Sequence, residues 1–379
     1  MVRYTRAFVA VLTLVTALGA GLPGVVARAE GAWYPGRLLS AGPLGRPWAG
    51  LDGVQRIEYV TTGPGGDLVQ AAAVVRIPEG PAPDGGRRVV AWDHGTSGLG
   101  QNCGLTGYDK LEQETGPAVA RLSDAGYAVV APDYIGLSPN SPGPHPYLHT
   151  TSEATATIDA VRAARSAYPG LAPSWAVAGW SQGGHAALGT GRLAPEYAPE
   201  LDFRGTAALA PVSNLENIFL RSRPDQPEIP GYVGRYAPMV LAGMVGAQLG
   251  PEVGDFLTPQ GQKFIAGLST NCNAQASAML DSTEIGSLVS RPLNDPDFAP
   301  VVRDYMSVPV SGYQDPILVV QGIYDTVVPL PLALALVGQF VLNDTEYAVQ
   351  LLQAGHEDLA EKGGLDRTLT FLDEVLPAG

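Results

Sequence analysis

Apolar positions along the chain follow two periodicities. Two β-rich runs, 55–61 and 68–77, flank a Gly-Pro-Gly-Gly-Asp turn and predict a hairpin or meander at the edge of a sheet. Beyond Gly86, short apolar runs alternate with segments in which apolar residues recur every three or four positions. The runs predicted as buried strands are 89–92, 127–131, 175–180, 205–210, 316–321 and 347–352. Such alternation predicts an α/β fold with a mostly parallel central sheet flanked by helices.

Several helix ends and one irregular stretch can be placed. One helix is predicted to end at Gly126, and a second to begin near Ser152, whose side chain can cap it. A closing helix is predicted over 365–376, where leucines form one stripe. The chain before residue 55 is rich in Gly and Pro and is predicted to be irregular.

One stretch, residues 213–310, breaks the alternation. It is poor in strand-like runs and has helix-like patches at 215–220, 236–249 and 260–268. A strand–helix–strand step needs only about 30 residues, so the excess length predicts an insertion. We interpret it as a helical cap, or lid, that separates two parts of one α/β core, residues 30–212 and 311–379.

The N-terminal segment has the features of a secretory signal. Arg3 and Arg6 precede an apolar run, 7–20, and an Ala-Arg-Ala sequence ends at Ala29. This pattern predicts a signal peptide over residues 1–29 and a secreted, extracellular protein. A membrane span needs about 20 apolar residues, so we expect no permanent span, with retention of this run as an anchor as the alternative.

The net charge of the chain narrows the classes of partner that it can bind. The formal net charge is -14, and it becomes -17 when the three arginines of residues 1–29 are removed. Such a surface repels nucleic acid, which we do not expect as a partner.

Only two cysteines occur, Cys103 and Cys272. Export makes a disulfide between them the default, two free buried thiols being the alternative.

A candidate nucleophile lies between a predicted strand and a helix. Gly179-Trp180-Ser181-Gln182-Gly183 matches G-x-S-x-G, in which the glycines allow a sharp turn that exposes the serine. With 47 glycines in the chain, the match alone is weak. Its context is favourable, because the apolar run 175–180 precedes it and small residues that can open a helix follow it.

A serine needs a base, and the base needs a carboxylate that orients it. In this type of hydrolase the chain order is Ser, acid, His. Asp325 and His356 each follow a predicted strand, and His356 is the only histidine after Asp325. Asp315, Asp344 and Asp358 are rival acids; His145, His149 and His185 are interpreted as structural or surface groups.

The oxyanion that forms when a serine attacks a carbonyl group also needs hydrogen-bond donors. One is expected to be the backbone N–H of Gln182, and the second to come from the turn at residues 92–96. A backbone N–H near Thr96 can supply it. Asp93 can do so through its side chain if burial keeps it protonated, and a structural acid is the alternative. We expect no cofactor and no metal.

Taken together, the motifs resemble those of the secretory lipase family of fungal and actinobacterial α/β-hydrolases. They are Asp93 to Gly98, Cys103, Pro132 to Gly136, Gly179 to Gly184, Gly322 to Asp325 and Gly355-His356. The resemblance implies hydrolysis of triacylglycerols or other esters, an acyl-binding helical cap, a Cys103–Cys272 disulfide and Asp93 as an oxyanion donor. The chain departs from the family pattern in being short and in lacking a second cysteine pair near the histidine.

The function expected is therefore that of a secreted serine ester hydrolase, most simply a lipase acting on lipid esters, with a lipid–water interface as one possible site of action. The alternatives are a carboxylesterase or polyester hydrolase for short or polymeric acyl esters, and then a peptidase of the same fold. A noncatalytic binding protein on a hydrolase scaffold is a further alternative, because fold does not by itself establish function.

Overall fold

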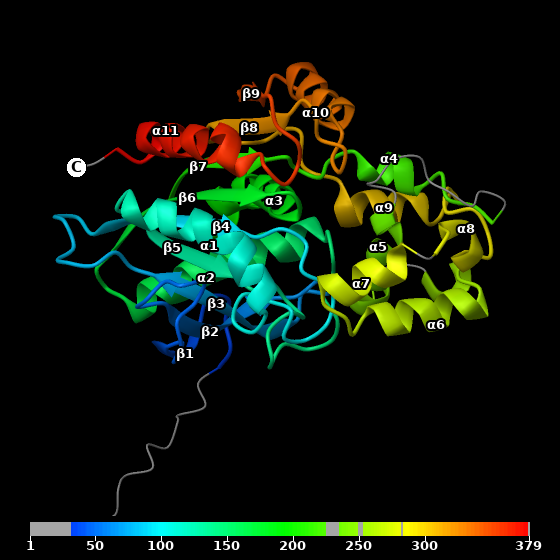
Figure 1. The fold of residues 1–379 in the computed structure, drawn as a ribbon, viewed down its shortest axis with the longest axis horizontal. Helices are drawn as coiled ribbons and strands as arrows, with labels where there is room; N and C mark the ends of the chain where they lie inside the picture. The colour runs from blue at the N-terminus through cyan, green and yellow to red at the C-terminus, as the bar shows by residue number, and fades with distance from the viewer. Residues whose placement is uncertain (1–31, 225–234, 249–252, 282, 378–379) are drawn as a thin grey trace, which may run out of the picture. The chain divides into compact units, whose positions relative to one another are not determined.

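A single sheet positions all the catalytic candidates (Figure 1). The computed structural model describes residues 32–224, 235–248, 253–281 and 283–377, so the predicted signal peptide, 1–29, lies outside the described residues. In this part of the chain nine strands pair in the order β1-β2-β3-β5-β4-β6-β7-β8-β9. The strands are β1 (Leu38–Pro43), β2 (Gln55–Thr62), β3 (Leu68–Arg76), β4 (Arg87–Asp93), β5 (Ala128–Pro132), β6 (Leu171–Trp180), β7 (Asp202–Leu209), β8 (Ile317–Gly322) and β9 (Ala348–Leu352).

The sheet has an antiparallel edge and a parallel remainder. β1, β2 and β3 pair antiparallel, as does β3 with β5, whereas the strands from β5 to β9 are parallel neighbours. The predicted edge hairpin and mostly parallel sheet are confirmed. Carboxyl ends of parallel strands meet at one edge of a sheet, where open α/β sheets form their sites.

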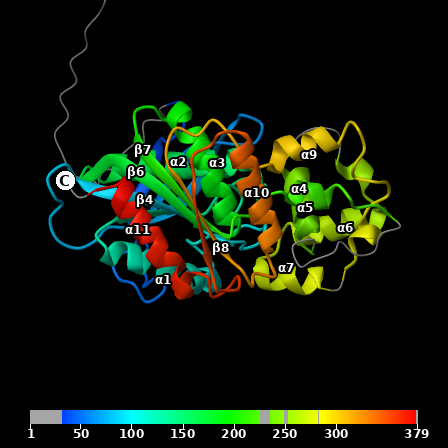
Figure 2. The same ribbon diagram turned by 90° about the horizontal axis from the view of Figure 1, so that it is seen from above.

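Helices cover both faces because neighbouring strand residues point to opposite sides. In β6, Ala176 and Ala178 join the core under α1 (Asp109–Asp124) and α11 (Leu365–Val375). Trp175 and Val177 join the core on the other face, under α2 (Thr150–Ala167) and α3 (Gln182–Tyr197). α10 (Leu330–Leu342) packs against β7 and β8 beside α3 (Figure 2). The order of layers is therefore helix, sheet, helix.

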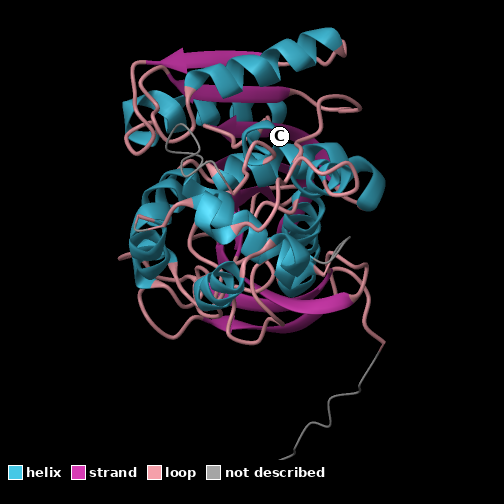
Figure 3. Cartoon of the chain, turned by 90° about the vertical axis from the view of Figure 1, so that its right-hand side faces the viewer, coloured by secondary structure: helices cyan, strands magenta, loops and turns pink. Residues whose placement is uncertain are grey.

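The described residues of 213–310 contain helices and no strand of the sheet. They gather at one end of the strands in Figure 1 and lie in front of the strands in Figure 3. Their elements are α4 (Leu215–Phe219), α5 (Ala237–Ala247), the 3-10 turn η2 (Val253–Phe256), α6 (Pro259–Leu268), α7 (Asn273–Leu280), α8 (Ile285–Leu288) and α9 (Ala299–Met306). Phe219, Leu241 and Leu268 belong to a core of this segment, which Leu99 and Tyr147 of the first part of the chain also join.

Three details differ from the sequence-based predictions. β1 forms where an irregular stretch was predicted, because an edge strand needs only backbone pairing with β2 and no continuous apolar run. The cap of α2 is His149, whose Nδ1 accepts from the Ser152 N–H at 3.1 Å, and Ser152 lies inside the helix. α10 was not predicted, because its apolar residues occur all round the helix without a clear stripe.

A disulfide joins the inserted segment to the loop that follows β4. Cys103 and Cys272 are bonded, with 5.2 Å between their Cα atoms and 169 positions between them in sequence. The backbone pairs at the same place: Leu99 N–H donates to Asn271 O at 3.0 Å, and Asn273 N–H donates to Ser97 O at 2.7 Å. The start of α7 is thus bound to the turn that follows β4.

Candidate active site

The nucleophile elbow is formed where β6 turns into α3. Ser181 has φ 60° and ψ -117°, outside the regions that L-residues usually adopt, and it is 7% exposed. A Cβ on Gly183 would collide with the Asp93 carbonyl, and one on Gly179 with the Gly183 backbone. The two motif glycines are therefore required by the close approach of β4, β6 and α3.

Two hydrogen bonds link the three candidate residues. Ser181 Oγ lies 2.9 Å from His356 Nε2, and His356 Nδ1 lies 2.7 Å from Asp325 Oδ2. A carboxylate can only accept, so Nδ1 carries a proton and Nε2 is left to accept the serine proton. Asp325 follows β8 and His356 follows β9, so adjacent parallel strands bring the two side chains together.

The Asp325 carboxylate is held by its own loop. Its Oδ1 accepts from the N–H groups of Val327 at 2.9 Å and Val328 at 2.7 Å, and its Oδ2 also lies 3.3 Å from Gln321 Nε2. Gln321 is fully buried at the end of β8. Sequence reasoning did not identify this supporting residue, because a buried glutamine in a strand has no motif of its own.

The rival acids have other roles in the structure. Asp358 Oδ1 accepts from the Gly355 N–H at 2.6 Å, and its pKa is lowered by the bond from Lys362 and then by that from Gly355. Asp344 is exposed beyond α10, and Asp315 lies before β8. The carboxylate that the structure brings to His356 is that of Asp325.

Asp93, for which an oxyanion donor and a structural acid are the alternatives, is not among the residues that line the cavity beside Ser181. It has no exposed surface, and burial raises its pKa well above the usual range, against a bond from Thr157. Thr157 Oγ1 lies 2.7 Å from Asp93 Oδ1 and 2.9 Å from the Glu153 carbonyl. The hydroxyl has one proton and the carbonyl can only accept, so a protonated Asp93 satisfies both contacts.

Thr96, from the same turn, does line the cavity, and its Oγ1 lies 2.9 Å from the Tyr147 hydroxyl. Gln182 is the first residue of α3, so its N–H is one of those that a helix cannot satisfy internally. The turn after β4 and the start of α3 are thus the two sources of backbone donors near Ser181.

The cavity at Ser181 has a volume of about 260 Å³ and a lining of mixed character. Apolar side chains in the lining include Val212, Leu215, Val327 and Val328. Polar side chains in the lining include Lys110, Glu114, Asn273, Ser277 and Glu357. Burial raises the pKa of the Glu114 carboxyl, against the opposing effect of Lys110.

The described residues contain neither a cluster of metal ligands nor a helix that could span a membrane. No group of three or more His, Cys, Asp or Glu side chains within them is arranged to hold a metal ion. None of the helices described has both the length and the apolar content needed to cross a bilayer.

Comparison with solved structures gives the same fold. The rice cell wall degrading esterase LipA from Xanthomonas oryzae is 23% identical, with a TM-score of 0.68 over 90% of this chain and 98% of that one. Candida antarctica lipase A is 20% identical, with a TM-score of 0.69 over 89% of this chain and 83% of that one. A putative hydrolase from Legionella pneumophila is 19% identical, with a TM-score of 0.68 over 86% and 90%. These likenesses show the α/β-hydrolase fold.

The family comparison goes further. No curated protein matches the sequence. Residues 111–372, more than half of the chain, match the secretory lipase family. The match includes Ser181, Asp325 and His356 but begins after Asp93 and Cys103. The chain therefore belongs to the secretory lipase family and is a serine ester hydrolase of the lipase and esterase type.

Proposed function

We propose that Ser181 is the nucleophile of this hydrolase, His356 its general base and acid, and Asp325 the carboxylate that orients His356. The continuous pair of hydrogen bonds, 2.9 Å from Ser181 to His356 and 2.7 Å from His356 to Asp325, is the observation that carries the proposal. His356 takes the serine proton as Oγ attacks the ester carbonyl, and then gives it to the departing alcohol. Water attacks the acyl-enzyme by the same route and releases the acid.

We propose that the oxyanion is bound by two backbone N–H groups, that of Gln182 and that of Thr96. The position of Gln182 at the start of α3 and that of Thr96 in the cavity wall support this assignment. Asp93 then has a structural role: its buried carboxyl hydrogen-bonds Thr157 of α2 and so stabilises the turn that follows β4. No metal or cofactor takes part in this mechanism.

We further propose that residues 213–310 act as the cap of the site, between core parts 30–212 and 311–379, and that cleavage after Ala29 releases the enzyme outside the cell. The apolar residues of the cavity lining, which include Val212 and Leu215, support binding of an acyl chain. Lipid esters, taken from a lipid–water interface, are the first candidate substrates.

A specific observation favours a second candidate. The lining also contains Lys110, Glu114 and Asn273, and the whole cavity measures about 260 Å³. Polar lining residues suit an alcohol group that carries hydroxyls, and a small cavity suits a short acyl group. An esterase for short acyl groups, or for acyl groups on a polymer, is therefore the alternative to a triacylglycerol lipase.

The test is hydrolysis of p-nitrophenyl esters from acetate to palmitate by the mature protein, with Ser181→Ala prepared identically. A rate that is greatest with long chains and rises when the ester passes from monomers to droplets supports the lipase. A preference for acetate or butyrate supports the esterase. A phosphonate probe that labels wild type and not Ser181→Ala excludes the noncatalytic alternative, and equal hydrolysis by both proteins would reject the Ser181 mechanism.

A further inference from the structure

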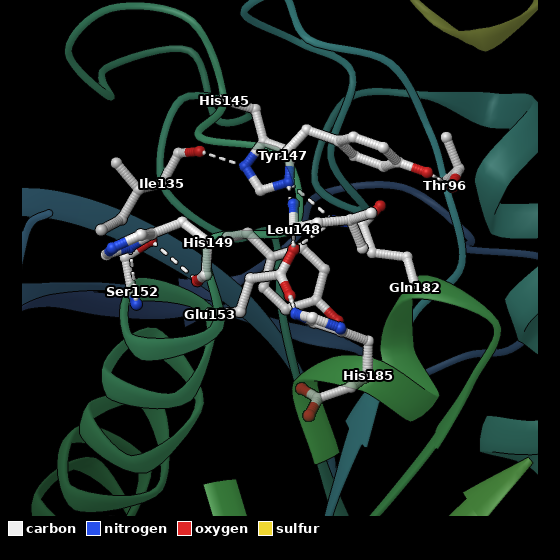
Figure 4. A network of polar contacts seen from close by, with 12 residues as sticks. Thr96, Ile135, His145, Tyr147, Leu148, His149, Ser152, Glu153, Gln182 and His185 are labelled. Carbon is white, nitrogen blue, oxygen red and sulfur yellow. Dashed lines mark hydrogen bonds and ion pairs between the residues drawn. The ribbon is translucent and has the colours of Figure 1, made fainter. Parts of the chain in front are cut away.

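A buried polar cluster lies behind the nucleophile, and the mechanism above gives it no role. Its centre is Glu153, in the first turn of α2, whose side chain has no exposed surface. Around it lie His145, His149, His185 and the side chain of Gln182, the residue that follows the nucleophile (Figure 4). Glu153 and Gln182 are both absent from the cavity wall.

Hydrogen bonds fix the Gln182 amide in one orientation. Its Nε2 lies 2.7 Å from Glu153 Oε1 and 2.7 Å from His145 Nε2. A carboxylate oxygen accepts, so the Gln182 atom facing it is the nitrogen, which must also donate to His145 Nε2. His145 Nδ1 then carries the ring proton, in agreement with its position 2.8 Å from the Ile135 carbonyl. Both amide protons of Gln182 are thus used on buried acceptors.

The anchoring depends on these two acceptors. The Gln182 amide oxygen is buried and has no hydrogen-bond partner among the described residues. Glu153 Oε1 is itself held by the Leu148 N–H at 3.1 Å. The carboxylate therefore connects α2 and the loop before it to the first residue of α3.

We propose that Glu153 is a positioning residue, which acts through the Gln182 side chain to aim the Gln182 backbone N–H at the oxyanion. The inference rests on the proposed function, because it assumes that this N–H is an oxyanion donor. Such donors stabilise a transition state only when they are already in place, and a displacement of about 1 Å can cost on the order of 100-fold in rate. No helical bond fixes the N–H of Gln182, so its side chain is the part that can be clamped.

The test uses two substitutions that leave every backbone donor in place. Gln182→Met removes the amide at similar volume, and Glu153→Leu removes the acceptor. Each is expected to lower kcat by about tenfold to 100-fold with KM within about twofold. The double variant is expected to be no slower than the slower single variant, because the two residues act in one chain. Glu153→Gln, which retains an acceptor oxygen, is expected to restore most of kcat.

A trifluoromethyl ketone, which forms a tetrahedral oxyanion on the serine, provides a second readout. Its inhibition constant is expected to rise by the same factor as kcat falls. Asp159→Asn is the matched control, because Asp159 is a second buried carboxylate of α2 that bonds Arg162 and Tyr197 instead. It is expected to change the melting temperature and to leave kcat and the inhibition constant unchanged.

The outcomes separate this inference from the proposed function. Unchanged kcat in Gln182→Met, or additive losses in the double variant, would overturn the role of Glu153 while Ser181→Ala remained inactive. Full activity of Ser181→Ala would instead overturn the mechanism itself. If Glu153→Leu does not fold, Gln182→Met and the inhibitor measurement still decide the question.

Discussion

Ser181 occupies a backbone conformation that is costly for any residue with a Cβ. Its φ of 60° and ψ of -117° lie where essentially only glycine is unstrained, and such residues cost about 1–3 kcal/mol each. The conformation presents the hydroxyl to His356 at 2.9 Å. Stability is therefore lowered at the position where the chemistry takes place.

Replacing Ser181 by glycine is expected to remove this strain together with the activity. Ser181→Gly should be more stable to urea than Ser181→Ala by about 1 kcal/mol, because the roughly 1–3 kcal/mol of strain that glycine relieves exceeds the roughly 0.4–1 kcal/mol that its more disordered unfolded chain costs. The measurement is the free energy of unfolding of the two inactive variants. Alanine being as stable as glycine would show that the elbow is not strained.

Asp325 is predicted to act through the tautomer of His356. Asp325→Asn should lower kcat by about 10⁴-fold, because an amide can present a donor to Nδ1 and so leave Nε2 protonated toward the serine. Asp344→Asn is the control, since Asp344 is exposed and its left-handed conformation suits asparagine. A loss of less than about tenfold in Asp325→Asn would mean that another group orients the base.

At the scale of the element, α2 starts among buried histidines. His149 caps the helix through Nδ1, and a ring that accepts there must remain neutral at that nitrogen. Burial lowers the pKa of His149 to about 4, although the charge of Glu153 opposes the effect. The His149 ring is therefore neutral in the folded protein over a pH range in which it is protonated in the unfolded chain. In the unfolded chain an ordinary histidine binds a proton below about pH 6.5.

The sign of the resulting pH dependence can be tested with His149→Asn, because asparagine is also a good N-cap. The folded pKa is depressed, so the contribution of His149 to stability is present above about pH 6.5 and is lost as the pH falls toward 4. The variant should gain on wild type by roughly 3 kcal/mol between pH 7 and pH 4, measured by urea unfolding. A pH-independent difference would contradict this.

At the scale of the whole molecule, one covalent bond joins two distant segments of the chain that each contribute to the cavity lining. The Cys103–Cys272 disulfide lies beside the backbone pairing of Leu99 with Asn271. The turn after β4 contributes Thr96 to the cavity, and α7 contributes Asn273. The bond therefore holds the start of α7 beside the turn after β4. If the inserted segment acts as the proposed cap, we expect it not to open as a hinged lid on that side.

Removing the disulfide is expected to lower the stability of the protein and to leave the residues that line the cavity less firmly positioned. A closed loop of this length contributes up to about 5 kcal/mol in the chain-entropy description. Cys103→Ser with Cys272→Ser should melt well below wild type in calorimetry and should show a raised KM with kcat less affected. Wild type in reductant is the control and should follow the double variant. Equal melting temperatures would show that the backbone pairing alone is sufficient.

The buried strands and the three catalytic candidates could be predicted from the sequence, because continuous apolar runs and the order of Ser, Asp and His carry clear signals. The support of the site could not be predicted. Which residue of the turn after β4 faces the cavity depends on its backbone, so the sequence left Asp93 and a backbone N–H near Thr96 as alternatives, and Thr96 is the one that lines the cavity. Glu153 comes from a helix 28 positions before Ser181 and has no motif, and only the packing of α2 against α3 brings it to Gln182.

The 169 positions between the two cysteines also set an order of assembly. Under the proposed secretion, a chain that crosses from its N-terminus delivers Cys103 to the oxidising side long before Cys272 arrives. The Cys103 thiol would then wait unpaired, and the disulfide that holds α7 beside the turn after β4 would close only after most of the chain has crossed. A copy of the enzyme retained in a reducing cytoplasm would fold without that bond, so the proposed secretion would couple full assembly of the substrate cavity to departure from the cell.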